Sequence, residues 1–147
     1  MSDAKVFDIL VVGGGMTGTA LALGLSRQGW QVGLIEGGDR DTLLQAPAPV
    51  EGVADFEPRV SAISVASQQL LETLGAWQGV VAGRHCPYQG MTVWDGDGTG
   101  RIHFDAAELQ ARALGTIVEN RSLVRALFEV VETSDVELID GVQVTGW

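Results

Sequence analysis

The chain has 147 residues, about the length of one domain, and 46% of them are apolar, so it can bury a substantial core. Nine basic and nineteen acidic residues give it a net charge of −10. This charge argues against nucleic-acid binding through a basic face and against simple electrostatic attachment to anionic lipid. The single cysteine, Cys86, excludes an internal disulfide framework and fits a reducing compartment.

Neither a metal site nor a targeting segment is indicated. The two histidines, His85 and His103, lie outside any zinc-ligand spacing. Residues 95–100 resemble the start of a calcium loop, but Ala106 stands at the twelfth position, where such a loop needs a glutamate. Residues 1–5 lack the features of a signal peptide, and no apolar run reaches the length of a membrane helix. We therefore predict no metal and a cytoplasmic location.

A short apolar strand that leads into glycines opens the chain. Residues 6–12 are predicted to form a buried strand, and the glycines that follow have the G-x-G-x-x-G spacing of dinucleotide-binding βαβ units. Gly13 allows the tight turn, Gly15 lets a pyrophosphate approach the backbone, and Gly18 lets the next helix pack on the strand. The free N–H groups and the dipole at the start of that helix favour phosphate.

The next two elements are a helix over 16–28 and a strand over 31–36. Gly24 within the helix lowers helix stability, which predicts close packing at that position. The strand ends in a carboxylate, Glu36, which lies 18 positions after Gly18. An acid about 20 residues after the glycines binds the adenosine ribose, and it would repel a 2′-phosphate. Together these features predict a dinucleotide site that does not take NADP.

The middle of the chain is predicted from turn and cap signals. Residues 37–58 lack periodicity and are expected to be an irregular connection. Residues 59–64 lead into a helix that ends at Gly75, with Ser61 or Ser64 as its cap. A hairpin of strands 88–95 and 101–104 is predicted next, followed by a short extended segment over 116–118. A helix capped by Asn120 follows, with an apolar stripe over 123–130. The last predicted elements are a strand over 136–139 and an extended segment that begins at Val142 and continues to Trp147.

Three segments together resemble a known family. They are the Gly13–Gly18 loop with Glu36, the stretch Glu57-Pro58-Arg59-Val60-Ser61-Ala62-Ile63-Ser64, and the stretch Gly115-Thr116-Ile117-Val118-Glu119-Asn120-Arg121. In this order and spacing they resemble the N-terminal part of the ubiquinone-biosynthesis hydroxylases. These are class A FAD-dependent aromatic monooxygenases, similar to p-hydroxybenzoate hydroxylase. The resemblance covers nearly the whole chain.

The resemblance implies an α/β fold. It would be a Rossmann-like FAD-binding βαβ domain, a parallel sheet with helices, with an inserted β-hairpin from the start of the substrate domain. Residues 1–147 would be the N-terminal part of an FAD/NAD(P)-binding domain, and residues 85–105 a hairpin of the substrate-domain sheet. Family members are much longer, so the C-terminal half of the fold would be absent and this truncated part inactive on its own.

The resemblance also implies the cofactors and their site. FAD would be the cofactor and NAD(P)H the co-substrate. Arg59 would reach the phosphate and flavin side of FAD, and Asn120 would lie close to the cofactor. No catalytic residue is identified. The cofactor-binding residues implied are Gly13, Gly14, Gly15, Met16, Thr17, Gly18, Glu36, Gly37, Arg59 and Asn120.

The implied function is hydroxylation of an aromatic ring, that of a ubiquinone precursor, with NAD(P)H and O2. One alternative is part of an NAD-dependent Rossmann dehydrogenase, although a hairpin after the second strand argues against it. Another is a chain that binds nucleotide without catalysis. The expected partner is a small aromatic or quinone-precursor substrate and no nucleic acid. The resemblance also leaves open three kinds of association: peripheral binding at the inner face of a membrane, binding to a biosynthetic complex, and formation of a homo-oligomer.

Overall fold

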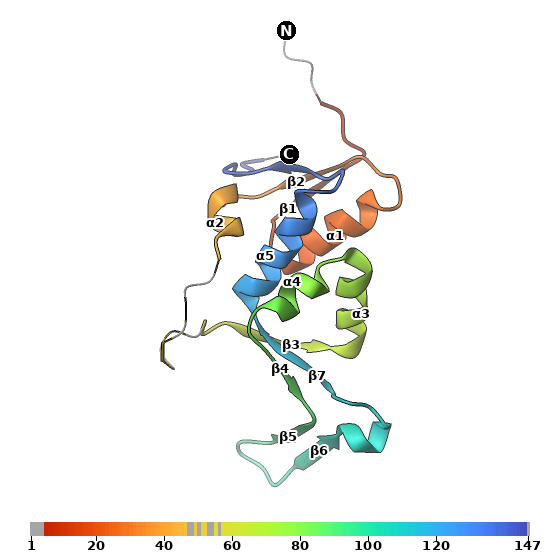
Figure 1. Cartoon of the computed structure of the whole chain (residues 1–147), viewed down its shortest axis with the longest axis vertical. Helices are drawn as coiled ribbons and strands as arrows, with labels where there is room; N and C mark the ends of the chain where they lie inside the picture. The colour runs from red at the N-terminus through yellow and green to blue at the C-terminus, as the bar shows by residue number, and fades with distance from the viewer. Residues whose placement is uncertain (1–4, 47–48, 50, 53–54, 56, 147) are drawn as a thin grey trace.

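The computed structural model describes residues 5–46, 49, 51–52, 55 and 57–146. The described part is elongated, with a parallel sheet at one end, a helical layer in the middle and two antiparallel sheets at the other end (Figure 1). The predictions for residues 1–4 and for Trp147 lie outside the described residues, as do those for six positions of the connection predicted over 37–58.

The parallel sheet contains β1 (Ile9–Val12), β2 (Val32–Ile35) and β8 (Glu137–Ile139) in the order β1-β2-β8. Helix α1 (Met16–Ser26) connects the first two strands, and α5 (Asn120–Val131) precedes the third. Both helices lie on the same side of the sheet (Figure 1). The predicted α/β architecture, a parallel sheet with helices, is confirmed.

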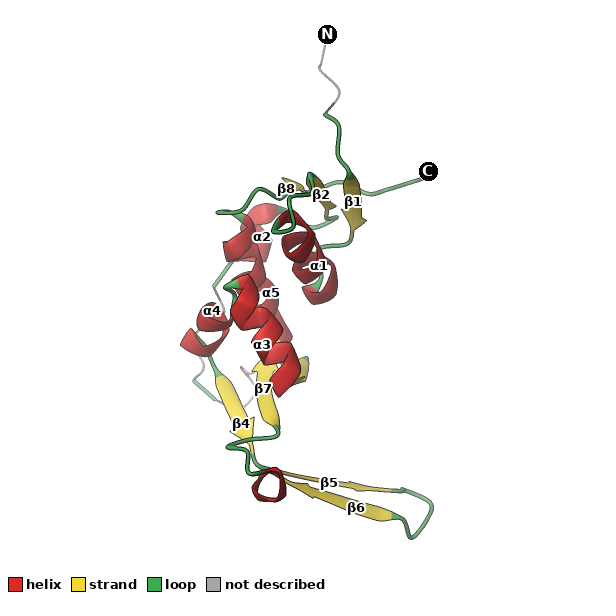
Figure 2. Ribbon diagram, turned by 90° about the vertical axis from the view of Figure 1, so that its right-hand side faces the viewer, coloured by secondary structure: helices red, strands yellow, loops and turns green. Residues whose placement is uncertain are grey.

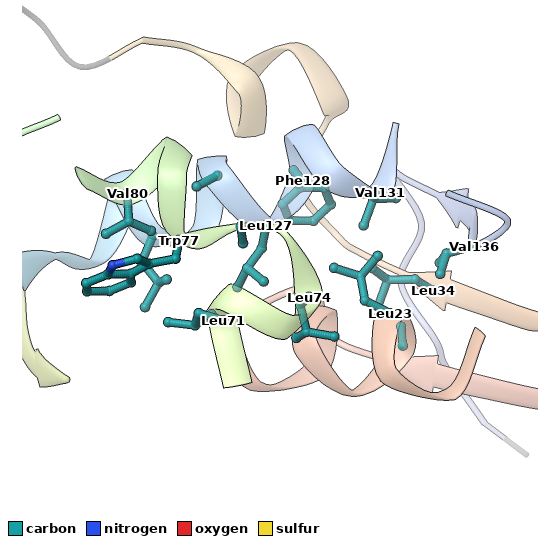
Figure 3. Close-up of a cluster of buried hydrophobic side chains, with 14 of the residues drawn as sticks. Leu23, Leu34, Leu71, Leu74, Trp77, Val80, Leu127, Phe128, Val131 and Val136 are labelled. Atoms are coloured by element: carbon teal, nitrogen blue, oxygen red, sulfur yellow. The ribbon is translucent and has the colours of Figure 1, made fainter. Parts of the chain in front are cut away.

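One hydrophobic core joins the sheet to all the longer helices. Leu34 of β2 and Leu23 of α1 belong to the same buried cluster as Leu127 and Phe128 of α5 (Figure 3). The largest buried members of this core include Leu23, Leu34, Leu71, Leu74, Trp77, Val80, Leu127, Phe128 and Val131. Because α5 packs on α1 and also on α4 (Trp77–Ala82), it connects the two ends of the molecule.

The second sheet is antiparallel and lies at the other end of α5. Its strands are β3 (Val60–Ser64), β7 (Gly115–Glu119) and β4 (His85–Tyr88), in the order β3-β7-β4. The sequence predicted residues 59–64 only as a lead into a helix. They form a strand because each residue from Val60 to Ser64 pairs with β7, a partner more than fifty residues away.

A two-stranded hairpin extends away from this sheet (Figure 2). It consists of β5 (Gly90–Trp94) and β6 (Arg101–Asp105), paired from Gly90 opposite Asp105 to Trp94 opposite Arg101. The predicted first strand, 88–95, is in fact divided, since Tyr88 belongs to β4 and pairs with Gly115 of β7.

Helix α3 (Val65–Leu74) has the predicted cap and end. The Ser64 hydroxyl accepts a hydrogen bond from Ser67 N at 3.2 Å, and Gly75 ends the helix in the left-handed conformation at a φ of 82°. The cap is therefore Ser64 and not Ser61, whose hydroxyl binds Asn120.

Three short helices were not predicted, namely α2 (Arg40–Leu44), α4 (Trp77–Ala82) and the 3-10 helix η2 (Ala106–Leu109). The irregular connection predicted over 37–58 is wrong at α2, where Asp39 caps the helix by accepting from Thr42 N at 2.9 Å. Helices of four to six residues show too little periodicity to be recognised, and packing on neighbouring elements stabilises them.

Two further predictions are wrong in detail. Asn120 does not cap α5, because it is the first residue of the helix and Glu119 occupies the cap position. Gly24 is not closely packed, since a Cβ there would meet no atom within 4 Å. The extended segment predicted from Val142 pairs with no strand over the described residues 142–146.

Candidate cofactor site

The glycine loop lies where β1 ends, beside the end of β2. Gly13 N donates to Ile35 O at 2.8 Å, and its φ of 99° is one that residues with a Cβ rarely adopt. A Cβ on Gly18 would lie 2.0 Å from Gly13 O and 3.5 Å from the Val11 side chain of β1, so the predicted close approach of the helix to the strand is confirmed. Both glycines are therefore required by the backbone itself.

The outer side of the loop is open. A Cβ built on Gly13 or on Gly15 would meet no atom within 4 Å. Gly15 is the N-cap residue of α1, and no side chain in the described part of the chain caps this helix. Met16 is half-buried in the first turn, and Thr17 beside it is exposed. Free N–H groups at a helix start, next to open space, fit a pyrophosphate.

The inner side of the loop is closed by two side chains. A Cβ on Gly14 would lie 2.7 Å from the Phe128 ring and 2.8 Å from Glu36 Oε2. Thr19, fully buried in α1, donates from its hydroxyl to Gly14 O at 2.9 Å. The loop is thus held from below by α5 and tied to its own helix, which leaves its outer side fixed and accessible.

Glu36 is brought next to the loop, as its spacing predicted. Its Oε2 accepts a hydrogen bond from Gly14 N, and its Oε1 accepts from Gly38 N at 2.8 Å. The residue is half-buried, and Gly37 beside it is exposed. The carboxylate therefore has a fixed position at the carboxyl ends of two adjacent parallel strands, where α/β folds bind nucleotides.

Arg59 and Asn120 form a second cluster with Ser61. Asn120 N donates to Arg59 O at 3.0 Å, and the Ser61 hydroxyl donates to Asn120 Oδ1 at 2.6 Å. Asn120 is half-buried, while Arg59 is exposed. These contacts join the start of β3 to the start of α5.

The predicted site residues thus lie in two clusters at the two ends of α5. Phe128 of this helix packs under the glycine loop, whereas Asn120 is its first residue. Eight residues of α-helix separate them by about 12 Å. A ligand that contacts both clusters must therefore be extended, as a dinucleotide is.

The sequence did not reveal the ion pair beside the second cluster. Glu119 is 4% exposed, and it accepts from Arg84 Nε at 3.0 Å and from Arg84 Nη2 at 2.7 Å. The hydrogen bonds from Arg84 lower the pKa of Glu119 below its ordinary value. Arg84 carries no local signal of this role, because its partner is 35 positions away.

Neither a metal site nor a membrane-spanning helix is found in the described residues. They contain no group of three or more His, Cys, Asp or Glu side chains placed to hold a metal ion. None of their helices is both long and apolar enough to cross a membrane.

Solved structures with a similar fold include monooxygenases. PqsL from Pseudomonas aeruginosa, described as a probable FAD-dependent monooxygenase, superposes with a TM-score of 0.68 at 20% identity over 95% of this chain and 34% of its own. The p-nitrophenol 4-monooxygenase PnpA from Pseudomonas putida superposes with a TM-score of 0.60 at 20% identity over 90% of this chain and 31% of its own. The fold is therefore the one that these monooxygenases share over about a third of their length.

The sequence relatives are ubiquinone hydroxylases. The 3-demethoxyubiquinol 3-hydroxylase of Escherichia coli is 46% identical over 85% of this chain and 30% of its own length. The ubiquinone hydroxylase UbiL of Rhodospirillum rubrum is 38% identical over 86% of this chain and 27% of its own length. The resemblance predicted from the three motifs is confirmed, and the chain spans about 30% of the length of these relatives. No protein-family model matches the chain.

Proposed function

We propose that this chain is the FAD-binding part of a flavin-dependent monooxygenase that hydroxylates the aromatic ring of a ubiquinone precursor. The observation that carries the proposal is the glycine loop, open at Gly13 and Gly15 and bonded to Glu36 through Gly14. The chain spans about 30% of the length of the relatives that it matches. We therefore propose cofactor binding for these residues, and the complete reaction only for a whole enzyme of this kind.

The residues present fit an extended dinucleotide. Gly13, Gly15 and the first turn of α1 would receive the pyrophosphate, and Glu36 would accept hydrogen bonds from the adenosine ribose. Arg59 and Asn120, at the other end of α5, would contact the flavin half. The bound flavin supplies the redox and oxygen chemistry of this class, while the protein binds, orients and excludes water.

Three further parts of the proposal concern the substrate side. The β5–β6 hairpin would belong to the sheet of a substrate domain. NAD(P)H would be the co-substrate that reduces the flavin. Because ubiquinone precursors are lipid-soluble, the enzyme would work at the inner face of a membrane.

Titration of the purified chain with FAD tests the proposal. We expect quenching of flavin fluorescence that saturates, with no comparable binding of NAD. Binding of NAD without FAD would overturn the flavin assignment in favour of a dehydrogenase. Binding of neither would remove the cofactor role from this chain.

Glu36→Arg separates a specific role from general electrostatics. FAD is an anion, so a more positive protein should bind it more tightly if only net charge matters. Loss of the ribose hydrogen bonds predicts weaker binding instead, by about tenfold or more. Glu72→Arg, an equal change of charge on the exposed side of α3, is the control and should not weaken binding.

A further inference from the structure

We propose that Glu119 is a positioning residue that sets where Arg59 and Asn120 lie relative to each other. The inference rests on the proposed function, because these two residues are its contacts with the flavin half. Glu119 itself need not touch the cofactor.

The buried Glu119 carboxylate gathers donors from three separate parts of the chain. Arg84, between α4 and β4, binds both oxygens, at 3.0 and 2.7 Å. Glu57 N donates to Oε1 at 3.2 Å, and the Ser122 hydroxyl of α5 donates to Oε2 at 3.5 Å. All these contacts meet at the junction of β7 and α5.

The positions of these contacts connect Glu119 to the second cluster. Glu57 lies two residues before Arg59, and Glu119 lies directly before Asn120. The hydrogen bond from Glu57 N to Glu119 therefore lies next to the backbone bond from Asn120 N to Arg59 O. Movement of the carboxylate would shift both ends of this bond.

Stability alone is a weak reason for such a pair. A buried ion pair often adds no more stability than apolar side chains of similar volume, because desolvation offsets the attraction. A two-point contact between a guanidinium and a carboxylate does fix direction, since both groups are planar. The geometry thus fits a role in placement.

Glu119→Gln tests the role with little change of shape. The amide keeps one acceptor oxygen but presents an NH2 group toward Arg84, so one of the two bonds is lost. We expect faster hydrogen exchange at the Asn120 amide and about tenfold weaker FAD binding. Binding of ADP, which needs only the glycine loop and Glu36, should not change. A variant that merely destabilised the fold would weaken both ligands.

Glu129→Gln is the matched control. Glu129 lies in α5, ten positions after Glu119, and pairs with Arg125 at 2.7 Å. This substitution should leave the exchange rate and both affinities unchanged. If Glu119→Gln does not fold, Arg84→Lys provides the second variant, since it keeps the positive charge and loses the two-point contact.

The outcomes distinguish the positioning role of Glu119 from the proposed binding of FAD. Faster exchange at Asn120 with a loss of FAD affinity alone supports the inference. Unchanged exchange, or equal loss of FAD and ADP affinity, overturns it. If the unmodified chain binds neither ligand, the proposed function fails, and the exchange rate by itself still decides whether Glu119 places Asn120.

Discussion

The two ends of α5 form their parts of the site in different ways. At the Phe128 end, the site is backbone, and four glycines within six positions shape it. At the Asn120 end, the site consists of side chains at the starts of β3 and α5, with the Arg84–Glu119 ion pair beside them. A backbone site depends on the absence of side chains, whereas a side-chain site depends on charge and on hydrogen bonds. The two ends should therefore respond to different substitutions.

The largest effect is expected from Phe128→Ala. Phe128 is 1% exposed and lies under the glycine loop, so its removal should lower the free energy of unfolding by about 4 kcal/mol and loosen the loop. Urea denaturation measures the change, with Phe128→Leu as a control that should lose less. A loss below about 1 kcal/mol would show that the loop is not supported from α5.

Alanine substitutions at Gly18 and at Gly15 should separate effects on stability from effects on FAD binding. Gly18→Ala places a Cβ against Gly13 O and should cost about 3 kcal/mol of stability. Gly15→Ala meets no neighbour and should cost no more than about 1 kcal/mol, as at an ordinary helix N-cap, yet it should weaken FAD binding. Thermal unfolding and FAD titration of both variants check this. Equal stabilities would contradict the close approach at Gly18.

At the other end of the helix, stability should depend on pH. Arg84→Met leaves Glu119 buried without its cation and should cost about 2 kcal/mol at pH 7, less than for a fully buried pair because Arg84 is 32% exposed. The folded chain lowers the pKa of Glu119, so the stability that this carboxylate contributes is present above its ordinary value of 4.5 and is lost as pH falls below it. The difference between the two proteins should shrink over that range. If the difference in the free energy of unfolding between the two proteins stays constant down to acid pH, the cost of Arg84→Met comes from lost packing and not from the ion pair.

The smallest effect, and one of opposite sign, is expected from Gly24→Ala. Gly24 lies in the same helix as Gly18 but has open space around it. Alanine there should stabilise the chain by about 0.8 kcal/mol, the difference in helix propensity. Chemical denaturation checks the sign, and destabilisation would mean that this glycine too is required by packing.

The same contrast explains what the sequence could predict. The glycine loop, Glu36 and the parallel strands follow from residues close together in the chain, and their spacing predicts them. Phe128 under Gly14 and Arg84 beside Glu119 join residues far apart in the chain, and no local pattern encodes such pairs. The β3 strand was missed for the same reason, since its partner strand begins at Gly115. The motif resemblance named Asn120 as a site residue, but only the structure shows what holds it in place.

The most direct test of a site divided between the two ends of α5 compares FAD with ADP, which lacks the flavin half. Isothermal titration of both ligands into Asn120→Ala and Glu36→Gln measures each end separately. We predict that Asn120→Ala weakens FAD and leaves ADP unchanged, while Glu36→Gln weakens both by similar factors. If Asn120→Ala leaves FAD unchanged, or weakens ADP as much as FAD, the two clusters do not share one extended cofactor.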